Sequence, residues 1–392
     1  MPVINRIADF HDDMIAWRHD LHMHPELALQ EVRTSGVVQE KLRAFGVDEV
    51  HAGLAGTGVV GVIRGRPGDG AVGLRADMDA LPIHEATGAA YASRTPGVMH
   101  ACGHDGHTTM LLGATRYLAE TRNFDGTVYL IFQPAEENLN GADRMIKDGL
   151  FERFPMRQVY GLHNWPGLPA GVFAWRDGDV MAAVANIEIV VTGRGAHGAQ
   201  PHHGVDPIVV SAAIVSALQS IVARTLDPGE SGVVTIGSIA GGNIYNVIPE
   251  SVRMLGTARW FSPKVGDQLE AGVRRLATGI ADSFGASAQV LFDRTFPATV
   301  NDPTAMALAR NAAETVAGEA RVVHMYKPTM GGEDFAFMLQ KKQGAYIMMG
   351  AGRGEGDPQV HHPRYDFNDA MLPIGASYWA TLAEQLLGRV VN

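Results

Sequence analysis

The feature that most constrains the fold is an alternation of short apolar runs with longer helical patterns. β-Rich runs bounded by glycine or polar residues recur along the chain, and they predict strands at 58–63, 72–74, 127–132, 158–162 and 345–349. Helical patterns lie among them, at 7–22, 34–45, 107–119 and 142–149. Strands that alternate with helices predict an α/β domain, with a mixed, largely parallel sheet buried on both faces. The unbroken apolar run 128–132 is typical of a central strand.

A different pattern begins near residue 183. It predicts strands at 186–192, 232–239, 251–260 and 287–292, with helices at 206–224 and 265–284. The order βαββαβ is that of a ferredoxin-like α+β domain. Because the α/β pattern resumes afterwards, we expect a catalytic domain in two parts, 1–182 and 297–392, with an inserted domain at 183–296.

Size, charge and cysteine content narrow the class of protein. A chain of 392 residues is long enough for two cores. A formal net charge of −10 argues against nucleic acid or an anionic membrane as a partner. The single cysteine cannot form an internal disulfide, and the N-terminal residues lack the basic and apolar regions of a signal peptide. The apolar stretch 205–222 is interrupted by Asp206 and Pro207, so we expect a cytoplasmic protein without a membrane span.

The run His100–His107 contains the only cysteine and several imidazole and carboxylate side chains. Thiolate, imidazole and carboxylate donors together suit borderline divalent ions such as zinc, manganese, cobalt or nickel. On an extended backbone Cys102 and His104 would share a face and could reach one ion. The alternative is that Cys102 is simply a small buried apolar residue.

Other candidate donors come directly after expected strands, where open α/β sheets bind ligands. Glu136 and Glu137 are adjacent, so one can ligate a metal while the other transfers protons, although a solvated acidic pair is a common alternative. His163 opens a proline-rich segment that predicts a rigid loop. Of the pair His361–His362, one histidine can ligate while the other lies on the surface.

These motifs, in this order, resemble the metal-dependent aminoacylase/carboxypeptidase superfamily, peptidase family M20, in its amidohydrolase branch. That branch includes hippurate hydrolases, N-acyl-amino-acid amidohydrolases and plant auxin-conjugate hydrolases. The resemblance spans nearly the whole chain. The segments that carry it are 18–22, 75–82, 100–107, 132–137, 161–164, 195–197, 246–249, 331–335 and 361–365.

The resemblance implies a role for individual residues. A two-metal centre would be held by Cys102 as the bridging ligand together with His104, Glu137, His163 and His361. Of the last histidine pair, His361 matches the ligand position better than His362. Glu136 matches the general base.

Three further positions match functional residues outside the ligand set. Asp79 matches an acidic residue of the site, and Asp77 stands where other branches carry a histidine ligand. His197 matches a histidine that, in dimeric relatives, reaches the partner's site and stabilises the oxyanion. Asn246 matches a substrate-binding position in the inserted domain, which the resemblance implies to be a lid and dimerisation domain.

The function implied is hydrolysis of the amide bond of an N-acyl amino acid by a water that two divalent ions (Mn, Zn, Co or Ni) activate. The substrate is then a small molecule, and we expect a homodimer or homotetramer formed through the inserted domain. A dipeptidase or carboxypeptidase of the same family is the alternative among enzymes. A metal-binding module without catalysis is the alternative from another class, and the non-ligand Glu136 argues against it.

Overall fold

The structure is a computed structural model that describes residues 3–388, and the chain divides into two compact units. Among these residues, the first unit comprises 3–180, 300–328 and 333–388, and the second comprises 181–299 and 329–332. Each unit has a hydrophobic core of its own. The predicted boundaries fall after residues 182 and 296, whereas the units divide after 180 and 299, and the prediction placed 329–332 in the catalytic domain. The role of the second unit as a lid or dimerisation domain remains a prediction.

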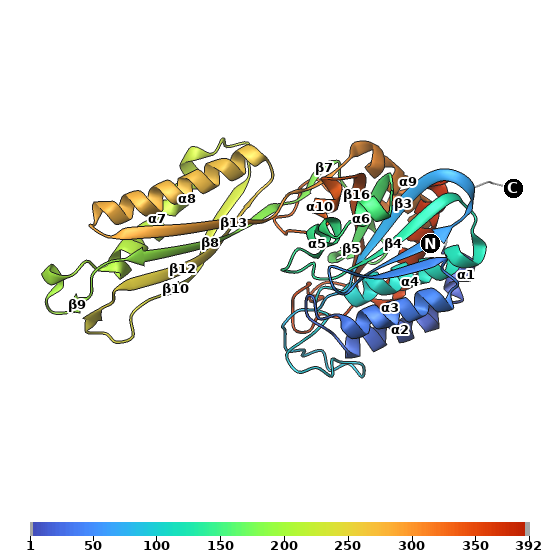
Figure 1. The fold of residues 1–392 in the computed structure, drawn as a ribbon, viewed down its shortest axis with the longest axis horizontal. Coiled ribbons are helices and arrows are strands. Elements are labelled where there is room, and N and C mark those ends of the chain that lie inside the picture. Colours follow the sequence, from blue (N-terminus) through green and yellow to red (C-terminus); the bar gives the residue numbers. More distant parts are fainter. Residues whose placement is uncertain (1–2, 389–392) are drawn as a thin grey trace. The chain divides into compact units, whose positions relative to one another are not determined.

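The first unit is built on an eight-stranded mixed sheet with the order β1-β2-β4-β3-β5-β16-β6-β15 (Figure 1). Its centre is parallel, because β3 pairs in parallel with both β4 and β5, and β5 does so with β16. The edge formed by β1 and β2 is antiparallel. The strands are β1 (Glu49–Leu54), β2 (Gly58–Arg64), β3 (Arg66–Asp77), β4 (Asp125–Gln133), β5 (Gln158–Pro169), β6 (Phe173–Trp175), β15 (Val322–His324) and β16 (Gln343–Gly352).

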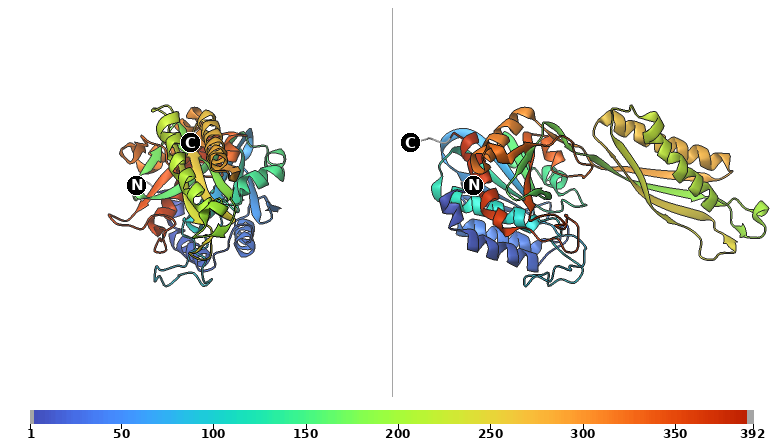
Figure 2. Two further views of the ribbon diagram at one scale, coloured as in Figure 1. Left: turned by 90° about the vertical axis from the view of Figure 1, so that its left-hand side faces the viewer. Right: turned by 180° about the vertical axis from the view of Figure 1, so that it is seen from behind.

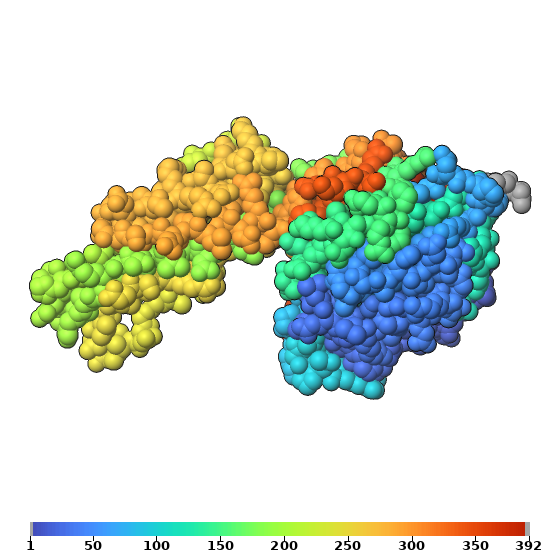
Figure 3. Space-filling model, viewed as in Figure 1, coloured from blue at the N-terminus to red at the C-terminus, as the bar shows by residue number. Residues whose placement is uncertain are grey.

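Helices cover the sheet of the first unit, and the N-terminal ones form an outer surface that is blue in Figure 3. Both faces of the sheet are covered, as β4 shows. Leu130 and Phe132 join the main core on one face, and Ile131, whose side chain points to the opposite face, is buried as well. The helices are α1 (Asn5–Ala8), α2 (His11–Met23), α3 (Val32–Ala44), α4 (His104–Thr121), α5 (Gly141–Lys147), α6 (Leu150–Arg153), α9 (Pro303–Ala317), α10 (Ala336–Leu339) and α11 (Leu372–Leu386). Two short strands, β7 (Gly178–Met181) and β14 (Thr299–Asn301), pair with each other.

The second unit is a four-stranded antiparallel sheet with the order β10-β12-β8-β13 and two long helices on one face (Figure 2). Its elements follow the predicted βαββαβ order, with a short strand pair added at one end. The fold class predicted from the sequence is therefore confirmed. The elements are β8 (Ala183–Thr192), β9 (Ala196–His197), α7 (Pro207–Thr225), β10 (Gly232–Ala240), β11 (Val247–Ile248), β12 (Ser251–Trp260), α8 (Pro263–Ser283) and β13 (Ser287–Phe296).

Helix α7 is long and apolar enough to span a membrane by length and composition alone. The Asp206 side chain accepts a hydrogen bond from the backbone N–H of Ile208 and caps the helix. Val210, Ile214 and Leu218 bury one face of α7 in the core of the second unit. The helix is therefore a layer of this core, and the absence of a membrane partner stays a prediction.

Some sequence-based boundaries were wrong. The single helix expected at 7–22 is two helices, because the chain turns at Asp9 and buries Phe10 in the core. His163 does not lie in a loop: it is inside β5, opposite Met348 of β16. The backbone from Cys102 to His104 is also not extended, because His104 is the first residue of α4.

Candidate metal centre

The start of α4 brings Cys102 and His104 to the sheet. Gly103, which precedes the helix, has φ +93°, a left-handed conformation that glycine adopts without strain. A Cβ atom at this position would lie 2.5 Å from both Asn164 Nδ2 and the Tyr365 hydroxyl. Glycine is therefore required here, and it allows the chain to present the thiol and the imidazole on either side of a tight turn.

Two histidines, His104 and His163, place a ring nitrogen in the same space. His163 Nδ1 lies 2.6 Å from the Asn164 carbonyl oxygen, and His104 Nδ1 lies 2.9 Å from the Asp79 carbonyl oxygen. A carbonyl oxygen only accepts, so each Nδ1 carries a proton, and in the neutral imidazole each Nε2 keeps a lone pair for a metal. His163 Nε2 lies 3.3 Å from Cys102 Sγ, and His104 Nε2 makes no hydrogen bond within residues 3–388.

Glu137 and His361 form a second group of possible ligands with Cys102. Glu137 Oε1 is buried and makes no hydrogen bond to the described residues, although it lies 3.2 Å from His361 Nε2 and 3.9 Å from His104 Nε2. His361 has φ +66°, and its backbone N–H donates to the Ala101 carbonyl oxygen at 2.7 Å. His362 belongs to no metal-competent group among residues 3–388, and its Nδ1 accepts from the Arg364 N–H.

Cys102 belongs to two groups of possible ligands at once. Its Sγ lies within 4.8 Å of donor atoms of His104 and His163 in one group, and of Glu137 and His361 in the other. This arrangement fits a thiolate shared between two cations. The chemistry fits too, because burial and the charges of Glu137 and Glu136 raise the pKa of the Cys102 thiol well above its ordinary value. A thiolate at this place needs positive charge, and divalent ions would supply it.

Asp79 holds the turn that carries the two glutamates. Its Oδ1 accepts from the Glu136 N–H and its Oδ2 from the Glu137 N–H, each at 3.0 Å. Burial, followed by the charges of Glu333 and Glu137, raises the pKa of Glu136 well above its usual range. Glu136 is thus a buried carboxyl beside the candidate ligands, with the environment of a proton acceptor.

A buried network of polar side chains adjoins these groups, and most of its members were not predicted from the sequence. His107 Nδ1 donates to Asp77 at 2.6 Å, while its Nε2 accepts from the Asn164 N–H at 3.0 Å. The Arg75 guanidinium contacts Asp77 at 2.6 Å and Glu333 at 2.8 Å. The sequence did carry a signal for His107. It lies three residues after His104, and residues three apart lie on one face of a helix, so both histidines could have been expected near the site. Asp77 therefore supports the network through His107 and Arg75.

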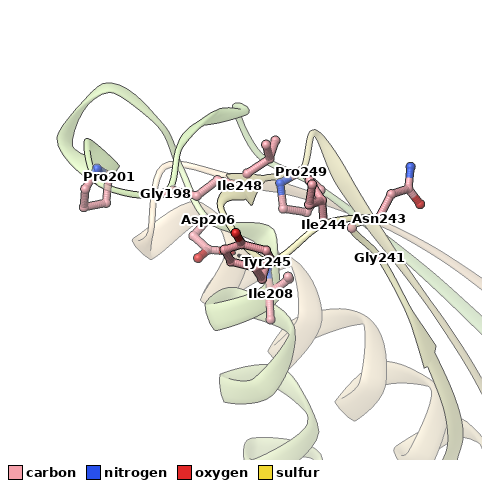
Figure 4. Close-up of a pocket in the computed structure, with 12 residues that line it drawn as sticks. Gly198, Pro201, Asp206, Ile208, Gly241, Asn243, Ile244, Tyr245, Ile248 and Pro249 are labelled. Carbon is pink, nitrogen blue, oxygen red and sulfur yellow. Dashed lines mark hydrogen bonds between the residues drawn. The ribbon is translucent and has the colours of Figure 1, made fainter.

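The remaining predicted residues lie in the second unit. His197 on β9 is paired with Val247 on β11, and the Gly198 N–H donates to the Asn246 carbonyl oxygen at 2.8 Å. The structure thus brings His197 and Asn246 together at one end of this unit. Beside them is a pocket of about 500 Å³ at the start of α7, where Tyr245 lies over Asp206 and Ile208 (Figure 4).

Comparison with known proteins decides the family. Residues 73–385 match the model of peptidase family M20/M25/M40. The chain belongs to peptidase family M20. It is 40% identical to a hippurate hydrolase of Campylobacter jejuni, over 99% of this chain and 100% of that protein. It is 37% identical to an N-acetylcysteine deacetylase of Bacillus subtilis, over 95% of this chain and 97% of that one.

A solved M20 structure supports the fold and the kind of centre. The Bacillus subtilis YXEP protein, described as a dinuclear metal binding peptidase of the M20 family, superposes with a TM-score of 0.83 and 35% identity. The match covers 98% of this chain and 100% of that one. This M20 chain is a metal-dependent amidohydrolase, of the kind that includes hippurate hydrolases and aminoacylases.

Proposed function

We propose that the enzyme hydrolyses the amide bond of N-acyl amino acids, with an aroyl or acetyl group on the nitrogen, and releases a carboxylic acid and a free amino acid. The observation that carries the proposal is Cys102 shared between two ligand groups, with Glu136 buried beside them. The similarity to proteins named for hippurate and N-acetylcysteine supports this substrate class.

We propose that Cys102 bridges two divalent ions, with His104, His163, Glu137 and His361 as the other ligands. Within residues 3–388, the buried atoms His104 Nε2 and Glu137 Oε1 make no hydrogen bond, which supports this assignment because a buried polar atom without a hydrogen bond is costly. Thiolate, imidazole and carboxylate donors suit Mn, Zn, Co or Ni. When bound, the ions would polarise the amide carbonyl and lower the pKa of a water molecule toward neutrality.

The residues around the centre would perform the proton transfers. Glu136 accepts a proton from the attacking water and gives it to the nitrogen of the leaving amino acid. Asp79 keeps Glu136 in place through the backbone N–H bonds of both glutamates. We propose that His197 of one subunit donates a hydrogen bond to the oxyanion that develops in its partner's site, and that Asn246 binds the substrate. Both residues are exposed on the second unit and free to meet a ligand.

A substrate panel tests this function. Purified enzyme is loaded separately with manganese, zinc, cobalt or nickel and given hippurate, N-acetyl amino acids and dipeptides. We expect the highest kcat/KM on an N-acyl amino acid. Faster cleavage of dipeptides would make the enzyme a dipeptidase or carboxypeptidase, and no turnover of any compound would leave a metal-binding module.

We also propose a homodimer or homotetramer formed through the second unit. Large apolar side chains are exposed on it, including Ile208, Val209 and Tyr245, of which Tyr245 is 97% exposed. Exposed apolar groups of this kind mark interaction surfaces. Sedimentation equilibrium tests the assembly: we expect a dimer or tetramer, which a Tyr245→Ser, Ile208→Ser variant weakens. A monomer at micromolar concentration would contradict it.

A further inference from the structure

The turn that carries Glu136 and Glu137 contains a residue in a disfavoured conformation. Ala135 has φ +56° and is fully buried, although it has a Cβ atom. Such a conformation persists where surrounding contacts hold it. The Ala135 carbonyl oxygen accepts from the Gly141 N–H at 3.0 Å, which closes the loop behind the two glutamates. The side chains that hold Ala135 therefore decide where Glu136 and Glu137 point.

Two buried carboxylates accept three successive backbone N–H groups of this turn. Asp79 takes those of Glu136 and Glu137, as described above. The third acceptor is Glu31, whose Oε1 accepts from the Ala135 N–H at 2.9 Å. Its other oxygen accepts from the Thr57 hydroxyl at 2.7 Å, and the side chain is fully buried. Glu31 is thus fixed at both oxygens, and one of them acts on the residue before Glu136.

Capping of α3 does not explain why the Glu31 carboxylate is buried at this place. Glu31 precedes α3, but its side chain makes no capping hydrogen bond. The first N–H groups of α3 are satisfied by Glu26, which accepts from Arg33 at 3.0 Å and from Thr34 at 2.8 Å. The two acidic residues thus have different partners. Glu26 caps α3, and Glu31 binds the turn that carries Glu136 and Glu137.

We infer that Glu31 is a positioning residue of this enzyme: by holding Ala135 in its left-handed conformation, it sets the directions of Glu136 and Glu137. The inference rests on the proposed function, in which Glu136 transfers protons and Glu137 ligates a metal. Glu31 itself does not touch the reacting atoms. It acts through one backbone hydrogen bond.

The test compares four proteins: the wild type, Glu31→Ala, Glu31→Gln and Glu26→Ala. Glu31→Gln keeps an oxygen that can accept from Ala135, and the Thr57 hydroxyl can turn to accept from the new amide. Glu26→Ala is the matched control, because it removes a half-buried cap in the same segment without removing a contact to the turn. For each protein one measures kcat and KM on the best N-acyl amino acid, thermal unfolding, and the visible spectrum and affinity of added Co²⁺.

We expect Glu31→Ala to lose about 10- to 100-fold in kcat, the usual effect of removing a supporting contact, with KM within about threefold. Its Co²⁺ spectrum should change and its Co²⁺ affinity should fall, because Glu137 lies on the same turn. Glu31→Gln should restore kcat to within about threefold of the wild type, as a neutral acceptor suffices. Glu26→Ala should unfold at a lower temperature and keep the wild-type kcat and spectrum.

Wild-type kcat and Co²⁺ spectrum in Glu31→Ala would overturn the inference, and so would an equal loss of kcat in Glu26→Ala. If Glu31→Ala does not fold, Glu31→Asp replaces it, since the shorter carboxylate keeps the charge but falls short of the Ala135 N–H. If the wild type hydrolyses nothing on the panel, the proposed function fails. The Co²⁺ spectra still decide the role of Glu31.

Discussion

Glu136→Gln separates catalysis from metal binding in this M20 enzyme. The substitution exchanges one carboxylate oxygen for an NH₂ group and keeps the size of the side chain. The backbone N–H of residue 136 still donates to Asp79, so the turn stays in place. What the variant loses is the proton acceptor.

The size of the effect follows from the role. General acid–base catalysis contributes about 10²- to 10⁴-fold to a rate, so kcat should fall by that factor, or by about 2.7–5.4 kcal/mol in the barrier. Metal content should stay at two ions per chain, because Glu136 is not among the proposed ligands. Stability should not fall in the metal-free protein: burial and the charges of Glu333 and Glu137 already raise the pKa of Glu136, so a neutral amide is well tolerated there.

The assay follows the release of free amino acid, with metal analysis of the same preparation. Glu152→Gln, at an exposed position in α6, is the control and should behave as the wild type. Turnover of Glu136→Gln within about tenfold of the wild type, with both metals bound, would refute the assignment of the base.

Three other predictions follow. Cys102→Ala should lose metal and activity together, and a fully loaded, active variant would exclude the bridging role. Gly103→Ala should lower the free energy of unfolding by about 2–5 kcal/mol in urea titrations. The new Cβ atom would clash with Asn164, and alanine is strained in the left-handed backbone conformation of this position. Burial opposes protonation of His22, but hydrogen bonds to Asp105 and Glu85 raise its pKa to about 9 from 6.5. The raised pKa stabilises the folded protein by about 3 kcal/mol below pH 6.5, and this stabilisation is lost as the pH rises to 9. His22→Gln should therefore flatten the plot of unfolding free energy against pH between 6.5 and 9. The same slope in the wild type and the variant over this range would contradict the prediction.

The sequence predicted the fold where pattern and packing agree. β4 lies between β2 and β3, and both of its faces are buried. A strand buried on both faces needs apolar residues throughout, which is why its unbroken apolar run predicted a central strand correctly. The second unit kept its predicted order because its central strands β8 and β12 alternate buried residues with more exposed ones over most of their length. The helix at 7–22 failed because helical spacing continues through Asp9, where tertiary packing of Phe10 makes the chain turn. Helices α9 and α11 were not predicted. Helix α9 buries Ala305, Ala309, Ala312 and Val316 at helical spacing, so the sequence did carry a signal for it. Helix α11 is buried continuously from Leu372 to Glu384 and shows no single apolar face.

The sequence predicted the candidate metal ligands of the site better than the residues that hold them in place. Chemistry alone singled out Cys102, His104 and the glutamate pair. His107 and Glu31 act through partners far away in the sequence, at Asp77 and Ala135, and no local pattern reports such a contact. The left-handed Ala135 is also invisible in the sequence, because glycine or asparagine is the usual sign of that conformation.

The most direct test of the central claim is anomalous diffraction from crystals of the cobalt-loaded enzyme. Two cobalt peaks should appear in each chain, both at about 2.3 Å from Cys102 Sγ, as for metal–thiolate bonds in general. A single peak, or two peaks of which only one lies within bonding distance of that sulfur, would contradict the shared thiolate.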